Sequence, residues 1–345
     1  MEKAYKNYYL SNYRTAFMGF SIIWVMLFHL GISDRIINCI TRFGYLGVDI
    51  FLFLSSYGLY YSIKKDSSIT HFYKKRFLRI LPSYYIVLLS IFIITCLYSG
   101  TFDLIQLFEK MSFLGYFIPS LEWPYFLWYI PAILFLYSIF PLLYKNLEKL
   151  KEKRFLLPLF ILLTIINFLL TDYIFDNNYD KGLILLIPRT FIFILGLIWA
   201  DVEYHNIEKV CKHKTIFILL FFLSLFIILI CDIFLTEYTI RFFMFDYITF
   251  IFGIAGIFII WIFLYNIFPN VIKKIIIFSG SHSLELYCIH ESLYTLRTEL
   301  KDFFNIPFYL SSIILFLVSF ILAYLLKKTL RCIFNDRKSR TVVSV

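Results

Sequence analysis

The stretch RTAFMGFSIIWVMLFHLG, residues 14–31, decides the fold class of this chain. Its apolar centre is long enough to cross a bilayer as one helix, because a crossing takes about 20 residues. An arginine stands at one end of the stretch, Arg14, and a histidine near the other, His29. A lone histidine of this kind is more often a hydrogen-bonded contact between helices than a reactive group, although its imidazole can take a proton near neutral pH. The rest of the chain has to supply its role.

Apolar runs of this length recur along all 345 residues. The chain is 61% hydrophobic and 16% charged, whereas soluble domains have about 45–50% apolar and about 25% charged residues. A large soluble helical protein of this composition would lack the polar surface to cover itself. The sequence therefore predicts an all-α fold, a polytopic membrane bundle of about ten transmembrane helices. The expected spans are residues 15–32, 43–62, 77–98, 125–144, 155–171, 182–200, 215–235, 246–268, 275–297 and 307–326.

The basic residues predict the orientation of these spans. With both termini in the cytoplasm, 25 of the 33 Lys and Arg residues lie in the cytoplasmic segments and 7 lie outside, as the positive-inside rule requires. The net charge of +10 then reflects membrane topology and needs no nucleic-acid partner. No linker divides the chain, so residues 1–330 are expected to form one membrane domain and residues 331–345 a basic cytoplasmic tail.

Ionisable side chains within the spans are candidates for function. A charge at the centre of a bilayer costs at least about 2.5–3.5 kcal/mol, so such residues are rarely kept without a role. The sequence has few of them: His29, Asp49, Arg189, Glu285, His290 and Glu291. The spacing of His282 and Glu285 allows a metal site, but no second ligand motif supports one, and the six cysteines have no paired spacing. No metal is expected.

Five motifs occur along the chain in a set order. They are FMGFSIIWVMLFHL, FGYLGVDIFLFLSSYGLYYS, FYKKRFLRILPSYY, LWYIPAILFLYSIFPLL and SGSHSLELYCIHESLY. Their order and intervals resemble those of acyltransferase family 3, and the resemblance covers most of the chain. It implies a multi-pass protein of the bacterial inner membrane that moves acyl groups, most often acetyl from acetyl-CoA, to hydroxyls of surface carbohydrates. Acyl-CoA would be a donor substrate, with no permanently bound cofactor, and the acceptor a lipid-linked or exported glycan.

The resemblance implies that His29 is the catalytic histidine. The family's arginine falls at Met18 in this chain, and Arg14 lies one turn earlier, about 40° away around the helix. The long side chain of Arg14 either reaches the same region and replaces that arginine, or extends to the lipid headgroups and leaves the arginine role vacant. Asp49 begins the second span and has two interpretations of equal weight. It orients the imidazole of His29, or it is an acidic residue favoured by the N-terminal end of a helix.

Arg76 and Arg79 stand where the third span begins. A spacing of three puts both on one helix face, and guanidinium groups match phosphate oxygens. We expect these arginines to bind the phosphates of CoA, although positive-inside topology alone also explains basic residues here. The bilayer would separate them from His29 by about 25–30 Å, so the donor would need a deep passage through the bundle.

Four further residues are candidates for binding the acceptor. Arg189 either serves the site or pairs with one of three carboxylates, those of Asp49, Glu285 and Glu291. Trp128 and Tyr129 fit a membrane-interface belt of aromatic residues, but they could also stack on a sugar. His290 falls on the family's Tyr-x-x-His pattern and is more often a structural hydrogen-bond partner than a second base.

Two other functions remain open from the sequence. A proton-coupled transporter or flippase of a glycan precursor would use the intramembrane His, Asp and Glu residues as a proton relay, but the sequence shows no internal repeat. A non-catalytic assembly protein is the third possibility, and Met18 at the arginine position favours it.

Overall fold

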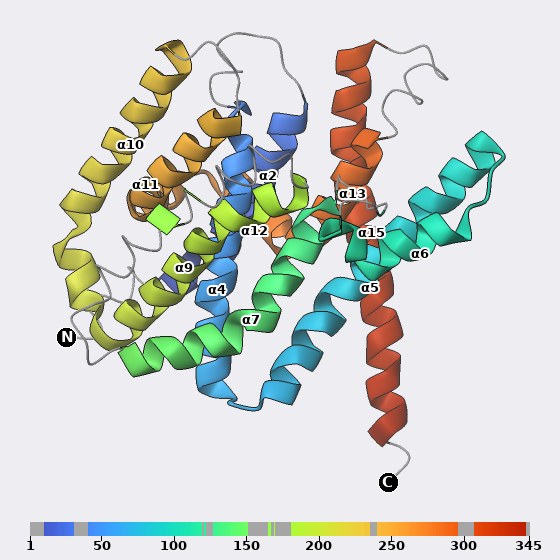
Figure 1. Ribbon diagram of the computed structural model, residues 1–345, viewed down its shortest axis with the longest axis horizontal. Helices are drawn as coiled ribbons and strands as arrows, with labels where there is room; N and C mark the ends of the chain where they lie inside the picture. The colour runs from blue at the N-terminus through green and yellow to red at the C-terminus, as the bar shows by residue number, and fades with distance from the viewer. Residues whose placement is uncertain are drawn as a thin grey trace.

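The computed structural model describes residues 10–30, 41–118, 121, 127–150, 165–166, 169, 181–234, 240–295 and 307–342. These residues form helices and the turns between them, with no β-strand among them (Figure 1). The helices are α2 (Leu10–His29), α4 (Gly47–Lys65), α5 (Ile69–Ser99), α6 (Leu104–Ser112), α7 (Tyr129–Leu150), α9 (Lys181–Lys212), α10 (Lys214–Phe234), α11 (Ile240–Ile267), α12 (Asn270–Ser281), α13 (Ser283–Thr295) and α15 (Phe308–Val342). Short 3₁₀ turns, η2 (Gly44–Leu46) and η3 (Leu114–Tyr116), complete the described structure.

Five of these helices, α4, α5, α7, α9 and α15, are long and apolar enough to cross a membrane. Shorter apolar stretches, Lys214–Ile230 and Phe252–Ile267, lie in α10 and α11. An all-α protein that passes through the membrane several times is thus confirmed. The count of about ten spans stays a prediction, and the expected span 155–171 falls almost wholly outside the described residues.

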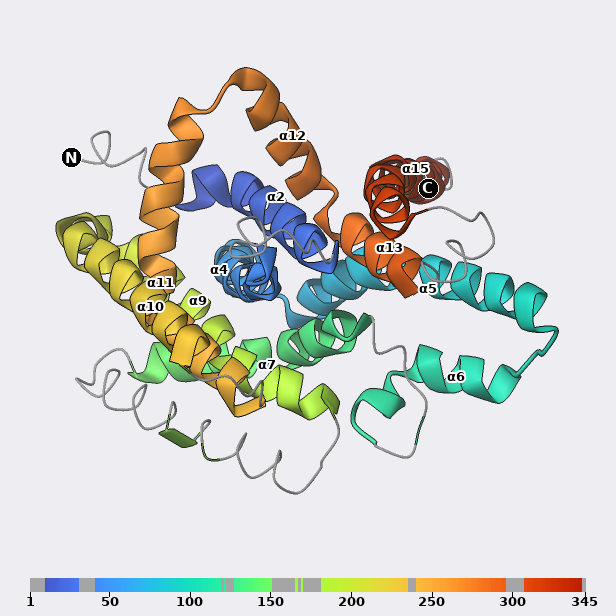
Figure 2. The ribbon, with the colours of Figure 1, turned by 90° about the horizontal axis from the view of Figure 1, so that it is seen from above.

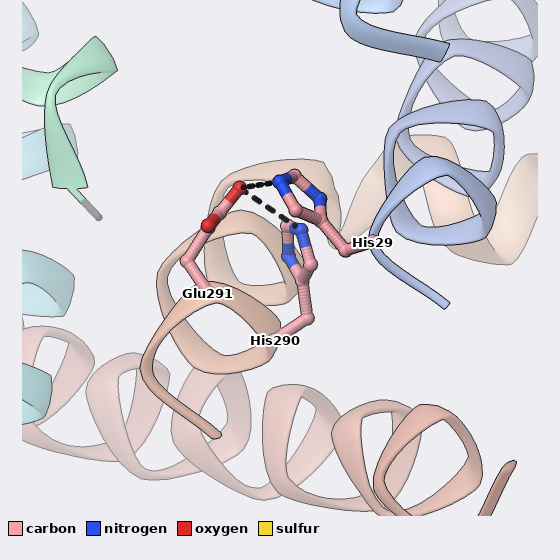
Figure 3. A group of neighbouring side chains, drawn as sticks. All are labelled: His29, His290 and Glu291. Carbon is pink, nitrogen blue, oxygen red and sulfur yellow. Dashed lines mark ion pairs between the residues drawn. The ribbon is translucent and has the colours of Figure 1, made fainter. Parts of the chain in front are cut away.

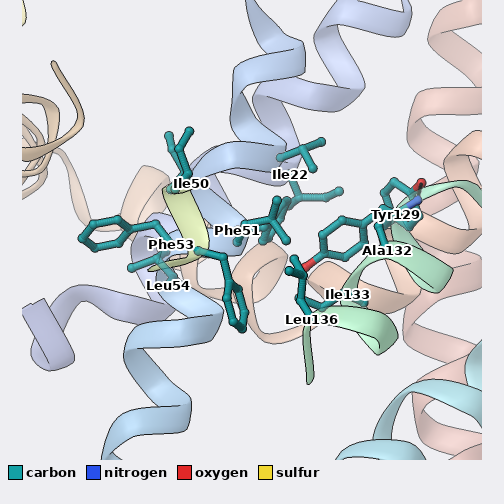
Figure 4. Packing of buried hydrophobic residues seen from close by; sticks show 14 of the residues in the cluster. Ile22, Ile50, Phe51, Phe53, Leu54, Tyr129, Ala132, Ile133 and Leu136 are labelled. Carbon is teal, nitrogen blue, oxygen red and sulfur yellow. Dashed lines mark hydrogen bonds between the residues drawn. The ribbon is translucent and has the colours of Figure 1, made fainter. Parts of the chain in front are cut away.

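Helix α4 forms the centre of the bundle. It packs against α2, α7 and α9, and 83% of its apolar window is buried, compared with 33% for α5 and for α15 (Figure 2). A helix that is apolar on all sides belongs inside a protein. Figure 4 shows side chains of α4 meeting those of α2 and α7; the labelled residues are Ile22, Ile50, Phe51, Phe53, Leu54, Tyr129, Ala132, Ile133 and Leu136.

Several segments that the positive-inside rule assigns to one side of the membrane meet at one end of the bundle. The backbone N–H of Leu10 donates to Glu203 Oε2 at 3.2 Å, and the hydroxyl of Tyr60 donates to Asp201 at 2.8 Å. Lys64 at the end of α4 pairs with Glu148 at the end of α7, 3.1 Å away. We call this the basic end; it carries Arg14, Arg76, Arg79 and Lys327. Its assignment to the cytoplasm stays a prediction.

The expected ninth span, 275–297, is two helices. α12 ends at Ser281 and α13 begins at Ser283, with His282 between them. α12 lies tightly against α2, because a Cβ on Gly280 would stand 1.8 Å from the carbonyl oxygen of Thr15, and one on Gly19 would stand 1.9 Å from that of Ile276. A backbone approach this close requires glycine on one side of each contact, and each helix supplies one of the two glycines. This contact fixes the position of α13 beside the end of α2.

The segment between α5 and α7 contains α6. Asp103 caps this helix by accepting hydrogen bonds from the N–H groups of Ile105 and Gln106. None of its residues is buried, and its apolar side chains Leu104, Ile105 and Phe108 are exposed, as suits a helix lying at a membrane surface.

Near the C-terminus, α15 continues without a break past residue 330, so the predicted basic tail begins inside a helix.

Candidate active site

His29 is the last residue of α2 and lies at the end of the bundle opposite Arg14. Its Nδ1 atom stands 3.0 Å from the carbonyl oxygen of Val25, one turn earlier in the same helix. A carbonyl oxygen can only accept, so Nδ1 carries hydrogen and the ring presents Nε2 outward. The side chain keeps 29% of its surface exposed, which leaves room for a substrate.

Helix α13 supplies two side chains that meet this ring. The Nε2 atom of His29 lies 3.3 Å from Glu291 Oε1, and the Nε2 atom of His290 lies 3.3 Å from the same oxygen (Figure 3). His290 is wholly buried, and its Nδ1 stands 2.8 Å from the carbonyl oxygen of Leu286. Both imidazoles are therefore held in the same tautomer, with Nε2 toward one shared carboxylate. We call His29, His290 and Glu291 the histidine centre.

The Nε2 atoms of both rings face the same oxygen of Glu291. A neutral imidazole in this tautomer turns a lone pair toward the carboxylate, whereas a protonated Nε2 would donate a charge-assisted hydrogen bond to it. The three ligand atoms lie within 4.8 Å of one another and could also surround a divalent cation, since two imidazoles and a carboxylate form a common zinc-binding set. The absence of a metal stays a prediction.

Asp49 lies elsewhere, in an ion pair with Arg189. Their Oδ1 and Nε atoms are 3.3 Å apart, and both residues are almost completely buried. Arg189 also donates to the carbonyl oxygen of Leu185 at 2.9 Å and stacks over the ring of Trp128 at 4.6 Å. Of the three carboxylates considered for Arg189, the structure selects Asp49. The carboxylate that faces His29 is Glu291.

Tyr129 connects the fourth predicted span to α13. Its ring is buried 5.2 Å from that of Tyr287, whose hydroxyl accepts a hydrogen bond from the Tyr129 N–H. The Tyr287 ring lies 5.9 Å from that of His290. Of the four predicted binding residues, His290 belongs to the histidine centre and Tyr129 reaches it through Tyr287. Arg189 and Trp128 contact each other, and Arg189 pairs with Asp49.

Arg14 lies at the basic end, with Arg76 and Arg79. At 1.5 Å per residue it stands about 22 Å along α2 from His29, so the structure does not bring these two predicted catalytic residues together. Its Nε donates to the carbonyl oxygen of Leu54 at 3.0 Å, and its guanidinium fills the space left by Gly58. Arg14 is within electrostatic range of both Arg76 and Arg79.

The three arginines have no acidic partner among the described residues. Arg76 donates to Ser62 Oγ at 2.6 Å and lies over the ring of Phe72. The positive charges of the other two arginines act on Arg14. Three like charges near one another without a carboxylate favour a bound anion.

A pocket of about 1030 Å³ opens beside Arg79, between α5, α13 and α15. Its basic lining residues are His71, Lys74, Lys75, Arg79, Lys327 and Arg331. Glu285 of α13 also lines it and is buried, with no hydrogen bond to its Oε2 atom. Glu285 and Glu291 are six residues apart, so α13 runs from this pocket to the histidine centre in about 9 Å.

Sequence reasoning missed two features of this site. Glu291 belonged to the group of ionisable residues within the spans, but nothing in the sequence distinguished it from Asp49 or Glu285 as the partner of His29. Lys327 and Arg331 have the spacing of one helix face, yet positive-inside topology accounted for them equally well.

Comparisons with known proteins agree with the motifs. A family model described as an acyltransferase domain matches residues 16–328. The protein "Putative acetyltransferase ORF330" of Acidianus two-tailed virus is 24% identical over 275 residues, which are 79% of this chain and 80% of the viral protein. No solved structure matches the chain. The resemblance drawn from the five motifs is thereby confirmed.

Proposed function

Because the chain belongs to this acyltransferase family and is an acyltransferase, we propose that it transfers an acyl group from acyl-CoA at the basic end to a carbohydrate hydroxyl at the histidine end. One observation carries the proposal. A single helix, α13, places Glu285 in the basic pocket and Glu291 beside His29. Acetyl is the acyl group to test first, since the similar viral protein is described as an acetyltransferase.

The donor binds at the basic end. Acyl-CoA carries a pyrophosphate and a 3′-phosphate, and the arginines there have no carboxylate partner among the described residues. Arg76 and Arg79 bind phosphate oxygens, and Arg14 joins them in this role, because its guanidinium lies with theirs and far from His29. The uncharged thioester arm then follows α13 inward. The pocket floor is close to the histidine centre, so the arm need not cross the full bilayer thickness.

The reaction follows from the tautomer of His29. Its Nε2 removes the proton of the acceptor hydroxyl, and the oxygen attacks the thioester carbon. The C–S bond breaks, the CoA sulfur leaves as a thiolate, and the imidazolium returns the proton to it. Glu291 stabilises the imidazolium while it exists, since its Oε1 lies 3.3 Å from Nε2. A covalent acyl-histidine is the variant in which Nε2 itself attacks the carbon.

The acceptor approaches from the exposed side of His29. A lipid-linked or exported glycan would present its hydroxyls there if the basic end faces the cytoplasm of a bacterial cell, as the charge distribution predicts. Trp128 offers its half-buried ring to the sugar and is held in place by Arg189. Tyr129, whose ring is buried, acts indirectly by packing against Tyr287 of α13. No contact in the described structure specifically favours a transporter or flippase.

Acyl transfer by the purified protein in nanodiscs tests this function. Labelled acetyl-CoA and a membrane glycan fraction are supplied, and the product is identified by the mass of an added acetyl group. We expect His29→Ala to lower kcat by about 10²–10⁴-fold, the usual contribution of a general base. Glu291→Gln should lower kcat by up to about 10⁴-fold, the loss seen when the carboxylate beside a catalytic histidine becomes an amide.

Glu148→Gln is the matched control, because it removes a carboxylate from an exposed pair with Lys64 and should leave transfer unchanged. Wild-type transfer by the His29→Ala protein would overturn the assignment.

A further inference from the structure

The basic groups around α5 form two clusters on different sides of that helix. Arg14 and Arg76 face α4, where Arg14 bonds to the backbone at Leu54 and Arg76 to Ser62. Lys327 and Arg331 line the pocket between α5 and α15. Arg79 belongs to both, since it lines the pocket and acts on Arg14. A donor with two separate anionic groups fits this arrangement.

The pocket between α5 and α15 is lined by basic side chains at its mouth and by a carboxylate at its floor. The α5 face runs through positions 71, 74, 75, 78, 79 and 82, which lie on one side of a helix. Because α15 runs in the opposite direction, Arg331 faces the mouth and Lys327 lies deeper. The floor holds the buried carboxylate of Glu285, which repels phosphate but not an uncharged chain. Phosphates are thus confined to the outer part.

Lys327 and Arg331 are suited to a single phosphate group. They are four residues apart and share a face of α15. Lys327 Nζ donates to the backbone oxygen of Ser281, which holds the ammonium at the pocket wall with two hydrogens left to donate. In the part of the chain that the structure describes, neither residue has a carboxylate at ion-pair distance. A pyrophosphate has more oxygens to satisfy and suits the three arginines better.

We propose that Lys327 and Arg331 bind the 3′-phosphate of acyl-CoA, while Arg14, Arg76 and Arg79 bind its pyrophosphate. The pocket of about 1030 Å³ between α5 and α15 then holds the adenosine, and α15 selects CoA over donors that lack the 3′-phosphate. This inference rests on the proposed function, because it names how the same acyl-CoA is recognised.

The test compares acetyl-CoA with acetyl-dephospho-CoA, which lacks only the 3′-phosphate, using the full-length protein in nanodiscs. We expect the wild-type protein to prefer acetyl-CoA by about 10–100-fold in kcat/KM, the usual range for hydrogen bonds between charged groups. In Arg331→Gln and in Lys327→Gln, kcat/KM for acetyl-CoA should fall toward the value for the dephospho donor, mainly through KM, while the value for the dephospho donor stays nearly constant.

Two controls make the outcome decisive. Lys328→Gln removes a charge from the next residue, which is exposed and does not line the pocket, and should keep the wild-type preference. Arg331→Gln is the variant least expected to misfold, because Arg331 is exposed and its side chain makes no hydrogen bond to any residue that the structure describes. Equal loss for both donors in Arg331→Gln, or a wild-type protein that does not distinguish the donors, would overturn the inference. If the wild-type protein transferred acetyl groups from neither acetyl-CoA nor acetyl-dephospho-CoA, the proposed function itself would be overturned.

Discussion

At the scale of single residues, the carboxylate that faces His29 is Glu291 and not Asp49. Asp49 begins the second predicted span near the outer end and looked suited to orient His29. In the structure it pairs with Arg189, 3.3 Å away, and neither side chain is accessible to solvent. Glu291 lies at the same distance from His29. One carboxylate therefore pairs with a buried arginine, and the other faces the imidazole of His29.

Asp49→Ala should destabilise the protein, because it leaves the buried guanidinium of Arg189 without its partner. Removing one member of a buried pair costs about 3–5 kcal/mol. The measurement is reversible unfolding in mixed micelles, followed by circular dichroism. The double variant Asp49→Leu with Arg189→Met should recover part of the loss, since no buried charge remains. A variant Asp49→Ala that keeps its stability but loses transfer would instead support the catalytic role that the sequence suggested.

At the scale of secondary-structure elements, the active site depends on how α12 and α13 dock on α2. Span positions were predictable, because about 20 apolar residues make a crossing recognisable in one sequence. The break at His282 was not, since residues 275–297 read as one apolar run. Which acidic residue meets His29 was not predictable either. That choice depends on contacts between helices more than 250 residues apart, and a helical pattern shows only which residues share a face.

Gly280→Ala should disturb the histidine centre, although Gly280 lies in α12, about one turn before α13 begins. The added Cβ would stand 1.8 Å from the carbonyl oxygen of Thr15, so α12 has to move away from α2. Overpacking of this kind costs about 1–3 kcal/mol, and the movement would lengthen the contact between His29 and Glu291. We expect a lower melting temperature and slower transfer.

Gly100→Asn is the control for the glycine substitution. Gly100 lies in open space with φ 69°, a conformation that Asn tolerates. It should behave as the wild-type protein does. Unchanged stability and unchanged transfer in Gly280→Ala would show that the close approach of α2 and α12 does not position the histidine centre.

At the scale of the whole molecule, one end of the bundle carries the arginines and lysines of the basic end, and the other carries the histidine centre. The charge pattern correctly grouped the segments that meet at the basic end, as the contacts of Leu10 with Glu203 and of Lys64 with Glu148 show. The motifs correctly indicated the family. The sequence did not show which helix contacts both the basic pocket and His29. In the structure α13 does so, with Glu285 in the pocket and Glu291 beside His29.

Transfer across a sealed membrane tests this account most directly. Acetyl-CoA does not cross bilayers, so labelled donor is added only outside vesicles whose outer face carries the basic end, with the glycan acceptor enclosed in the lumen. The account predicts that labelled acetyl groups appear on the enclosed glycan in wild-type vesicles and not in His29→Ala vesicles. Label on the enclosed glycan only when the donor is also enclosed would contradict it.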